Sequence, residues 1–156
     1  MHQELKIIDK FEGENEIYSN FYPVIVYFEG RNYPSVEHAY VAAKTKDEIF
    51  RKMISEIPAE KAWLARRYGR NKKKCKLRKD WDIIKIRIMK NLLMQKFSFE
   101  RFKTSLLSTG YAILIEGNYW HDNYWGNCYC KKCKDIPGKN NLGNLLMKVR
   151  KILGGQ

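Results

Sequence analysis

The stretch YPSVEHAYVAAK, Tyr33–Lys44, combines an extended approach, a helix start and several chemically active side chains. Pro34 fixes its own φ and disfavours helical backbone at Tyr33, so the chain enters this stretch extended. Ser35 can cap a helix, because its hydroxyl can accept a hydrogen bond from a first-turn N–H. Apolar residues then recur at helical spacing, which predicts a helix over about residues 35–46.

Two charged side chains of this helix are candidates for a binding or catalytic site. Glu37 and Lys44 are seven residues apart, so both leave the same helix face, about 10 Å apart along the axis. That spacing exceeds an i,i+4 ion pair and suits two groups that hold opposite ends of one ligand. The alternative is a first-turn glutamate favoured by the helix dipole and a solvated lysine.

Short elements are expected on both sides of this helix. We expect helices to start at Pro58, Asp80 and Asn141, and one helix to end at Gly69. We expect strands at 5–8, 24–28 and 112–116, a turn at 29–32, helices at 47–55, 58–68, 81–97, 99–109 and 142–153, and a long loop at 117–140. This order predicts an α+β fold, a single helix-dominated domain over residues 1–156 with a small β-sheet.

The composition of the 156-residue chain is that of a globular protein, with 44% hydrophobic and 13% aromatic residues. No run approaches the length of a membrane span, and the first ten residues lack the apolar stretch of a secretory signal. We therefore expect a cytosolic protein with no membrane partner. In that compartment the four cysteines are expected as free thiols or metal ligands. The sequence makes no prediction of oligomeric state.

Positive charge is concentrated in the middle of the chain. The net charge is +13, and residues 61–103 contain 16 Lys and Arg against 3 Asp and Glu. The densest part is RRYGRNKKKCKLRK, Arg66–Lys79. Such a segment is typical of a surface that binds phosphates or a polyanion. The alternative is a solvated face that serves only solubility.

Several short motifs occur in an order that resembles one known family. They are SNFYP at Ser19–Pro23, YPSVEHAYVAAK at Tyr33–Lys44, LRKDWD at Leu77–Asp82, DNYWG at Asp122–Gly126 and GKNNLGNLLMKVR at Gly138–Arg150. Each motif is weakly specific, but the ordered set is similar to the NADAR, or YbiA-like, family from about Ser19 to Leu153. Two features depart from the pattern: Ala43 stands where glutamine is frequent, and cysteines follow WGN.

The resemblance implies an enzyme that hydrolyses an N-glycosidic bond between a ribose carbon and an amino nitrogen. One branch of the family removes ADP-ribose from the amino group of guanine in DNA, and another acts on ribosylamino intermediates of the riboflavin pathway. The basic segment 61–103 favours the first branch, because phosphates flanking a modified base would add to binding. The partners expected are ADP-ribose or an ADP-ribosylated guanine nucleotide, and nucleic acid. A noncatalytic module that binds ADP-ribose or nucleic acid is the rival hypothesis.

The chemistry needs a carboxylate near the anomeric carbon, because the transition state resembles an oxocarbenium ion. Glu37 and Asp122 are the first candidates. Asp80 and Asp82 are the second candidates, because each has a structural explanation. Asp80 can cap a helix, and Asp82 can interact with the helix dipole in the first turn. No cofactor is required for this reaction.

Lys44 has two possible roles beside these carboxylates. It can hold a phosphate as a point charge, or its amine can capture a ring-opened ribosylamine as a Schiff base. The electrostatic role is the simpler one, because a nearby carboxylate can drive direct hydrolysis.

Other polar and aromatic side chains are candidate ligand contacts. Aromatic rings can stack on a base, arginine binds phosphate through a planar fork, and a helix N-terminus can face an anion. The predicted contacts are Ser19, Asn20, Phe21, Tyr22, Tyr40, Arg70, Arg78, Trp81, Asp82, Lys85, Trp125, Gly126 and Asn140. For each aromatic residue, packing in the core is the alternative.

The sequence CYCKKC places three cysteines close together, and a histidine precedes them. Cys128, Cys130 and Cys133 with His121 form a set that can hold tetrahedral zinc, with Cys75 as a distant further thiol. Reduced thiols in a loop are the alternative. Basic neighbours would favour thiolates in either case.

Overall fold

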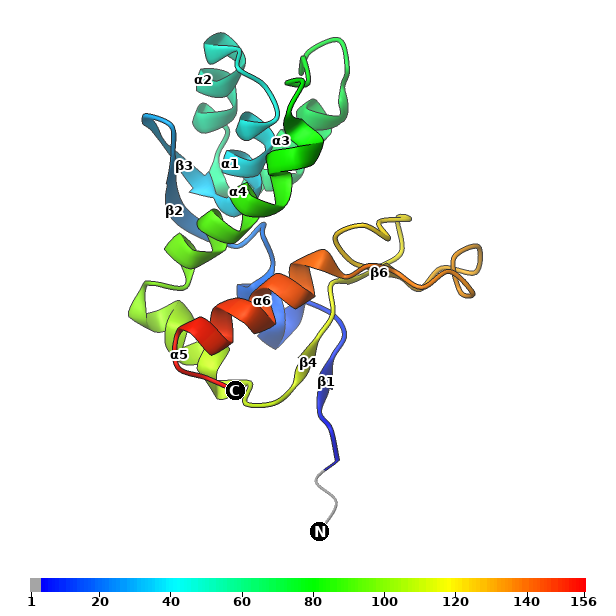
Figure 1. The fold of residues 1–156 in the computed structure, drawn as a ribbon. Coiled ribbons are helices and arrows are strands. Elements are labelled where there is room, and N and C mark those ends of the chain that lie inside the picture. Colours follow the sequence, from blue (N-terminus) through cyan, green and yellow to red (C-terminus); the bar gives the residue numbers. More distant parts are fainter. Residues whose placement is uncertain (1–3) are drawn as a thin grey trace. The chain divides into compact units, whose positions relative to one another are not determined.

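The computed structural model describes residues 4–156, which fold into two compact units. One unit is Asn20–Ser98 and the other comprises the described part of Met1–Ser19 together with Phe99–Gln156. Helices dominate both, with short strands between them, so the predicted α+β class is confirmed (Figure 1). The single domain over 1–156 stays a prediction. Across residues 4–156 no helix has the length and apolar character of a membrane span.

The unit Asn20–Ser98 begins with a hairpin. Strand β2 (Pro23–Phe28) pairs antiparallel with β3 (Arg31–Ser35), with an irregular register between Pro23 and Val26. The expected turn is tighter than 29–32, because β3 already begins at Arg31. The bend needs positive φ at Glu29 (38°) and Gly30 (89°), and the latter is a conformation that glycine adopts without steric cost.

Helix α1 (Val36–Ala43) follows β3 directly, as the sequence predicted, although it ends before residue 46. Its cap is confirmed, because Ser35 Oγ accepts a hydrogen bond from His38 N–H at 3.2 Å. All residues of α1 except Glu37 are buried, since the helix contacts α2 (Glu48–Glu56), α3 (Ala62–Arg70), α4 (Trp81–Lys96) and both hairpin strands. Helix α1 is therefore the central element of this unit (Figure 1).

The histidine of this helix has a structural role. His38 is fully buried, with Nδ1 2.6 Å from Ser35 Oγ and Nε2 3.1 Å from the carbonyl oxygen of Ile57. A carbonyl can only accept, so Nε2 carries the proton and Nδ1 accepts from the Ser35 hydroxyl. Burial lowers the pKa of His38, which favours this neutral ring.

The prediction that Gly69 ends a helix is wrong. After the short 3-10 turn η2 (Ala59–Lys61), α3 runs through Gly69 to Arg70. A Cβ at Gly69 would lie 2.8 Å from Val41 Cγ1. Glycine is present because α3 approaches α1 too closely for a larger residue.

Asp80 precedes α4 as predicted, but its carboxylate does not cap the helix. The carboxylate instead accepts two hydrogen bonds from Arg78, at 2.7 and 3.1 Å. An arginine fork matches a carboxylate with two parallel bonds, which outcompetes a single backbone N–H. The helix still buries Trp81, Met89 and Leu92 in the core of the unit.

The second unit is organised around α6 (Asn141–Ile152), which contacts α5 (Glu100–Ser108) and β4 (Ile113–Leu114). Strand β4 pairs in parallel with β1 (Ile7–Ile8). Both strands are shorter than expected. The 3-10 helix η1 (Gly13–Tyr18) contacts α5, where the Tyr18 hydroxyl donates to the Ser105 carbonyl oxygen at 2.8 Å. Their core includes Leu106, Leu114 and Leu146.

The expected loop 117–140 contains two further short strands, β5 (Gly117–Asn118) and β6 (Asn127–Cys128), paired in parallel. In residues 4–156 the strands thus form three two-stranded sheets. The predicted cap at Asn141 is off by one, because Asn140 holds the N-cap position. Asn140 adopts a left-handed conformation (φ 49°), which asparagine tolerates better than most residues.

Candidate functional site

Glu37 and Lys44 occupy opposite ends of α1, as the sequence predicted. The backbone N–H of Glu37 donates to the Asn20 carbonyl oxygen at 3.0 Å. Lys44 directly follows the helix, and its carbonyl oxygen accepts from the Arg78 N–H at 2.7 Å. Two other segments of the unit thereby fix both ends of the helix.

The amine of Lys44 lies in an unusual electrostatic environment. Its side chain is half-buried, and burial is the main reason that its pKa is lowered. The carboxylate of Glu37 and the thiol of Cys75 act in the opposite direction, while Arg70 and Arg66 lower the pKa further. Desolvation and two nearby guanidinium groups therefore increase the fraction of neutral, nucleophilic amine.

Arg66 and Cys75 were not among the predicted site residues. Arg66 and Arg70 are one turn apart on α3, so both can face Lys44 from one side of that helix. The i,i+4 spacing of the two arginines was visible in the sequence as a signal. The approach of Cys75 to Lys44 was not visible in the sequence, because it depends on the path of the loop between α3 and α4.

Aromatic rings surround this site. Tyr40 packs on Trp81 with ring centroids 5.1 Å apart, and both are almost fully buried. Lys44 Nζ lies 5.5 Å from the Tyr40 ring centroid, and the Arg66 guanidinium lies 5.9 Å from that of Phe21. Tyr40 and Trp81 are therefore core residues, whereas Phe21 is half-buried and more open to a ligand.

The predicted phosphate contacts fall into two groups. Arg70 is exposed and acts electrostatically on Lys44. Arg78 already bonds Asp80 and lies 3.7 Å from a Glu29 carboxylate oxygen, with 11% of its side chain exposed. Lys85 bonds Asp82 at 2.9 Å. A phosphate would have to compete with carboxylates at Arg78 and Lys85, so Arg70 is the better placed cation.

Asn20 presents an unused acceptor. It is 9% exposed, and its Nδ2 donates weakly to Met89 Sδ at 3.5 Å. Its buried Oδ1 has no hydrogen-bond partner among residues 4–156. Its neighbour Tyr22 lies under the ammonium of buried Lys96, 5.8 Å from the ring centroid. An unpaired buried acceptor costs stability, and a donor from an ordered water or from a ligand would remove that cost.

The remaining predicted residues belong to the second unit, and so does Ser19. Asp122 Oδ1 accepts hydrogen bonds from the N–H groups of Tyr124 (3.2 Å) and Trp125 (2.9 Å). This is an Asx turn, the structural alternative for an aspartate in this loop. The rings of Tyr124 and Trp125 meet edge to face with centroids 5.0 Å apart, and both are half-buried.

Gly126 and Asn140 have clear structural tasks. A Cβ at Gly126 would lie 2.0 Å from the Glu116 carbonyl oxygen, so only glycine fits. The Asn140 side chain accepts from the Glu116 N–H (3.0 Å) and donates to the Leu114 carbonyl oxygen (2.8 Å).

The start of α6 has little capacity left for an anion. The N–H groups of Asn141 and Leu142 donate to the carbonyl oxygens of Tyr124 and Trp125, at 3.2 and 3.0 Å. Two of the first N–H groups of the helix are thus used within the fold. A ligand role for Asn140 remains a prediction, and two of the N–H groups that motivated it already have partners within the fold.

The metal-ligand candidates converge. Four atoms, one from each of His121, Cys128, Cys130 and Cys133, lie within 4.8 Å of one another. Cys75 belongs to the other unit, where it acts on Lys44. The cluster thus contains the local residues that the sequence indicated, without the distant thiol.

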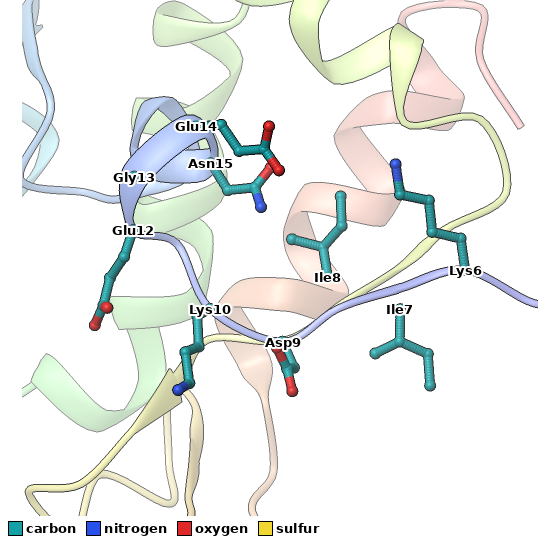
Figure 2. A pocket seen from close by; sticks show the side chains of 9 residues that line it. All are labelled: Lys6, Ile7, Ile8, Asp9, Lys10, Glu12, Gly13, Glu14 and Asn15. Carbon is teal, nitrogen blue, oxygen red and sulfur yellow. The ribbon is translucent and has the colours of Figure 1, made fainter.

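A hollow of about 550 Å³ lies along the segment from Lys6 to Asn15 (Figure 2). Two lysines and three acidic residues are among the residues that line it, and none of the predicted site residues does. It is separate from the side chains described above.

Comparison with known proteins defines the class. Residues 8–154 match the NADAR domain, and the chain belongs to the NADAR family. N-glycosidase YbiA of Shigella boydii is 36% identical over 137 residues, which cover 87% of this chain and 80% of that protein. A riboflavin biosynthesis protein of Vibrio vulnificus is 33% identical over 136 residues, 86% of this chain but 35% of that protein. The solved NMR structure of E. coli YbiA is 32% identical with a TM-score of 0.79, and the match covers 97% of this chain and 87% of that one.

Proposed function

We propose that this chain is an N-glycosidase that removes ADP-ribose from guanine bases of nucleic acid. The observation that carries the proposal is the site at α1, where the half-buried side chain of Lys44 interacts electrostatically with Glu37 and with two arginines of α3. The name of the YbiA relative supports N-glycoside hydrolysis. The cytosol is the proposed location, since thiols such as that of Cys75 stay reduced there.

Glu37 is the proposed acid–base group. It is the residue of α1 that is not buried, so its carboxylate can reach a ligand that covers the helix. In N-glycoside cleavage, a carboxylate near the anomeric carbon stabilises positive charge on the ribose or activates water. Asp122 is the second proposed carboxylate, although its Oδ1 already accepts two backbone hydrogen bonds.

Lys44 is proposed to use its amine. Burial and the arginines lower the pKa of Lys44, which is the condition for a nucleophilic lysine. The amine would attack C1 of the ring-opened ribosylamine, forming a C–N bond as the guanine amino group leaves with a proton. Water would then hydrolyse the imine and free both sugar and lysine. Glu37, which interacts electrostatically with Lys44, would move the protons.

Substituting Lys44 by arginine separates this role from simple phosphate binding. Lys44→Arg keeps the positive charge but cannot form a Schiff base, so turnover should collapse while ADP-ribose still binds. Borohydride added during turnover should trap sugar on the wild-type protein at Lys44, detected by peptide mass spectrometry. A Lys44→Arg protein that retains most activity, with no trapped adduct in the wild type, would show that Lys44 acts as a charge alone.

Basic side chains are proposed to bind the diphosphate of ADP-ribose and the phosphates of the flanking nucleic acid. Arg66 and Arg70 of α3 are the proposed partners of the ADP-ribose phosphates, because both lie near Lys44. The loop after α3 exposes Lys72, Lys73 and Lys74, and the Lys74 ammonium lies 4.6 Å from the Tyr68 ring centroid. These lysines are proposed to contact the phosphates of the nucleic acid.

The second candidate is hydrolysis of ribosylamino intermediates of riboflavin synthesis. The observation that favours it is the similarity to a riboflavin biosynthesis protein of Vibrio vulnificus. Assays on guanine-ADP-ribosylated DNA and on a ribosylamino-pyrimidine phosphate, at equal concentrations, separate the two. Faster release of ADP-ribose from the DNA supports the proposal, and faster cleavage of the pyrimidine supports the second candidate. Binding of ADP-ribose without turnover of either substrate would indicate a noncatalytic module.

A further inference from the structure

The loop Gly117–Asn140 contains a cluster of soft ligands that the proposed reaction does not use. His121 Nδ1 lies 3.3 Å from Cys133 Sγ and 3.4 Å from Cys130 Sγ. With Cys128 Sγ, the four ligand atoms all lie within 4.8 Å of one another. All three cysteines are free thiols, so no disulfide explains this convergence.

These distances match the edges of a zinc coordination tetrahedron. Zinc binds thiolate sulfur at about 2.3 Å and imidazole nitrogen at about 2.0 Å. Tetrahedral angles then place two sulfurs about 3.8 Å apart, and a sulfur and a nitrogen about 3.5 Å apart. The two sulfur–nitrogen separations of 3.3 and 3.4 Å lie close to this value, and all four atoms lie within 4.8 Å of one another, so one ion at their centre could reach all four.

The backbone already holds the ligands in place. The N–H of His121 points at Cys128 Sγ, 3.3 Å away, and the Cys133 N–H donates to the Cys130 carbonyl oxygen at 3.0 Å. The second bond closes the C-x-x-C segment into a turn. His121 has a φ of 68°, a conformation that costs energy for a residue other than glycine. Cys128 and Cys133 are buried in this arrangement, Cys130 is half-buried and His121 is exposed.

We propose that His121, Cys128, Cys130 and Cys133 bind one Zn²⁺ ion. Three thiolates, a neutral imidazole and Zn²⁺ give the site a charge of −1, and the ion replaces the thiol protons without any redox change. The lysines that flank the last two cysteines, Lys131, Lys132 and Lys134, offset this negative charge.

The role of this metal is structural. Four protein ligands fill a tetrahedral site and leave no position for water or substrate, which is the arrangement of structural rather than catalytic zinc. The ligands span residues 121–133 and enclose the segment Asp122–Asn127. Zinc therefore fixes the loop that carries Asp122 and Trp125.

Metal content and cobalt spectroscopy test the site directly. Protein purified under reducing conditions should contain about one equivalent of zinc by mass spectrometry, as expected for a tetrahedral structural site. Replacement with Co²⁺ should give the intense d–d bands of a tetrahedral thiolate site. Zinc far below stoichiometric, together with an octahedral cobalt spectrum, would overturn the proposal.

Matched cysteine variants locate the ion. Cys133→Ser should lose most of the zinc, whereas Cys75→Ser, which changes the thiol beside Lys44, should keep the full equivalent. If Cys133→Ser fails to fold, wild-type protein stripped by a chelator serves instead. Hydrogen exchange should then speed up in residues 117–140 and slow again when Zn²⁺ is returned. Unchanged exchange in that loop, or equal zinc in both variants, would contradict the assignment.

Discussion

Replacement of Gly69 by alanine tests how closely α3 must approach α1, on which the position of the arginines beside Lys44 depends. The new Cβ would lie 2.8 Å from Val41 Cγ1 and 3.0 Å from Val41 Cγ2, where ordinary contact begins near 3.4 Å. Val41 is 1% exposed, and a β-branched side chain has few other rotamers. One of the two helices must therefore move by roughly half an ångström.

Two opposing effects set the magnitude. Alanine is favoured over glycine in a helix interior by about 1 kcal/mol. Overpacking a filled core costs about 1 to 3 kcal/mol, and the two methyl contacts at 2.8 and 3.0 Å place Gly69→Ala in the upper half of that range. We expect the free energy of unfolding to fall by about 1 to 2 kcal/mol, measured by urea denaturation.

The sign should reverse when the obstacle is removed. In a Val41→Ala background the clashing methyl groups are absent, so Gly69→Ala should stabilise the protein by up to about 1 kcal/mol. Gly69→Ala should lower both stability and activity when Val41 is present. In the Val41→Ala protein it should lower neither. A stabilising effect of Gly69→Ala in the wild-type background would refute the close packing of α3 on α1.

Three further outcomes follow from the proposed site. Replacing Lys72, Lys73 and Lys74 together by glutamine should weaken the salt dependence of binding to ADP-ribosylated DNA. The slope of the logarithm of the binding constant against the logarithm of the salt concentration should become shallower by as much as about 2 to 3. Equal losses on a small ribosylated base would place these lysines in the catalytic site instead. Asp122→Asn retains the Oδ1 that accepts the Trp125 N–H, so unfolding should hardly change while activity falls at least about tenfold; full activity would leave Asp122 a purely structural residue. Because the pKa of Lys44 is lowered in the folded protein, the unfolded chain binds more protons between the two pKa values, and stability should rise with pH through that window. Urea unfolding of Lys44→Met should show a shallower rise, and identical pH profiles would contradict the burial of the amine.

Local signals predicted the helix at the centre of the site correctly. Pro34 and Ser35 fix the start of α1 by short-range sterics and one side-chain hydrogen bond, so neighbouring residues suffice to locate it. Gly69 misled the prediction because the reason for this glycine is Val41, a residue far away in sequence. Asp80 failed as a cap for a local reason, since Arg78, two residues earlier, competes for its carboxylate.

The composition of the site was only partly predictable. The seven-residue spacing placed Glu37 and Lys44 near the two ends of one helix, and CYCKKC indicated the cysteines that cluster with His121. The desolvation of Lys44 and the approach of Arg66 and Cys75 depend on how α3 and its following loop pack on α1. Burial of that kind arises from tertiary contacts, and sequence spacing does not report it.

In the proposed reaction, the carboxylate of Glu37 takes part in cleaving the bond between ribose and guanine. Single-turnover release of ADP-ribose from guanine-ADP-ribosylated DNA, by wild-type protein and by Glu37→Gln, tests it most directly. Glutamine keeps the shape and removes the charge, so release should slow by about two orders of magnitude or more, which corresponds to about 2.7 kcal/mol of barrier. Urea unfolding of the variant serves as the control for folding. A well-folded Glu37→Gln protein that releases ADP-ribose at the wild-type rate would contradict the account.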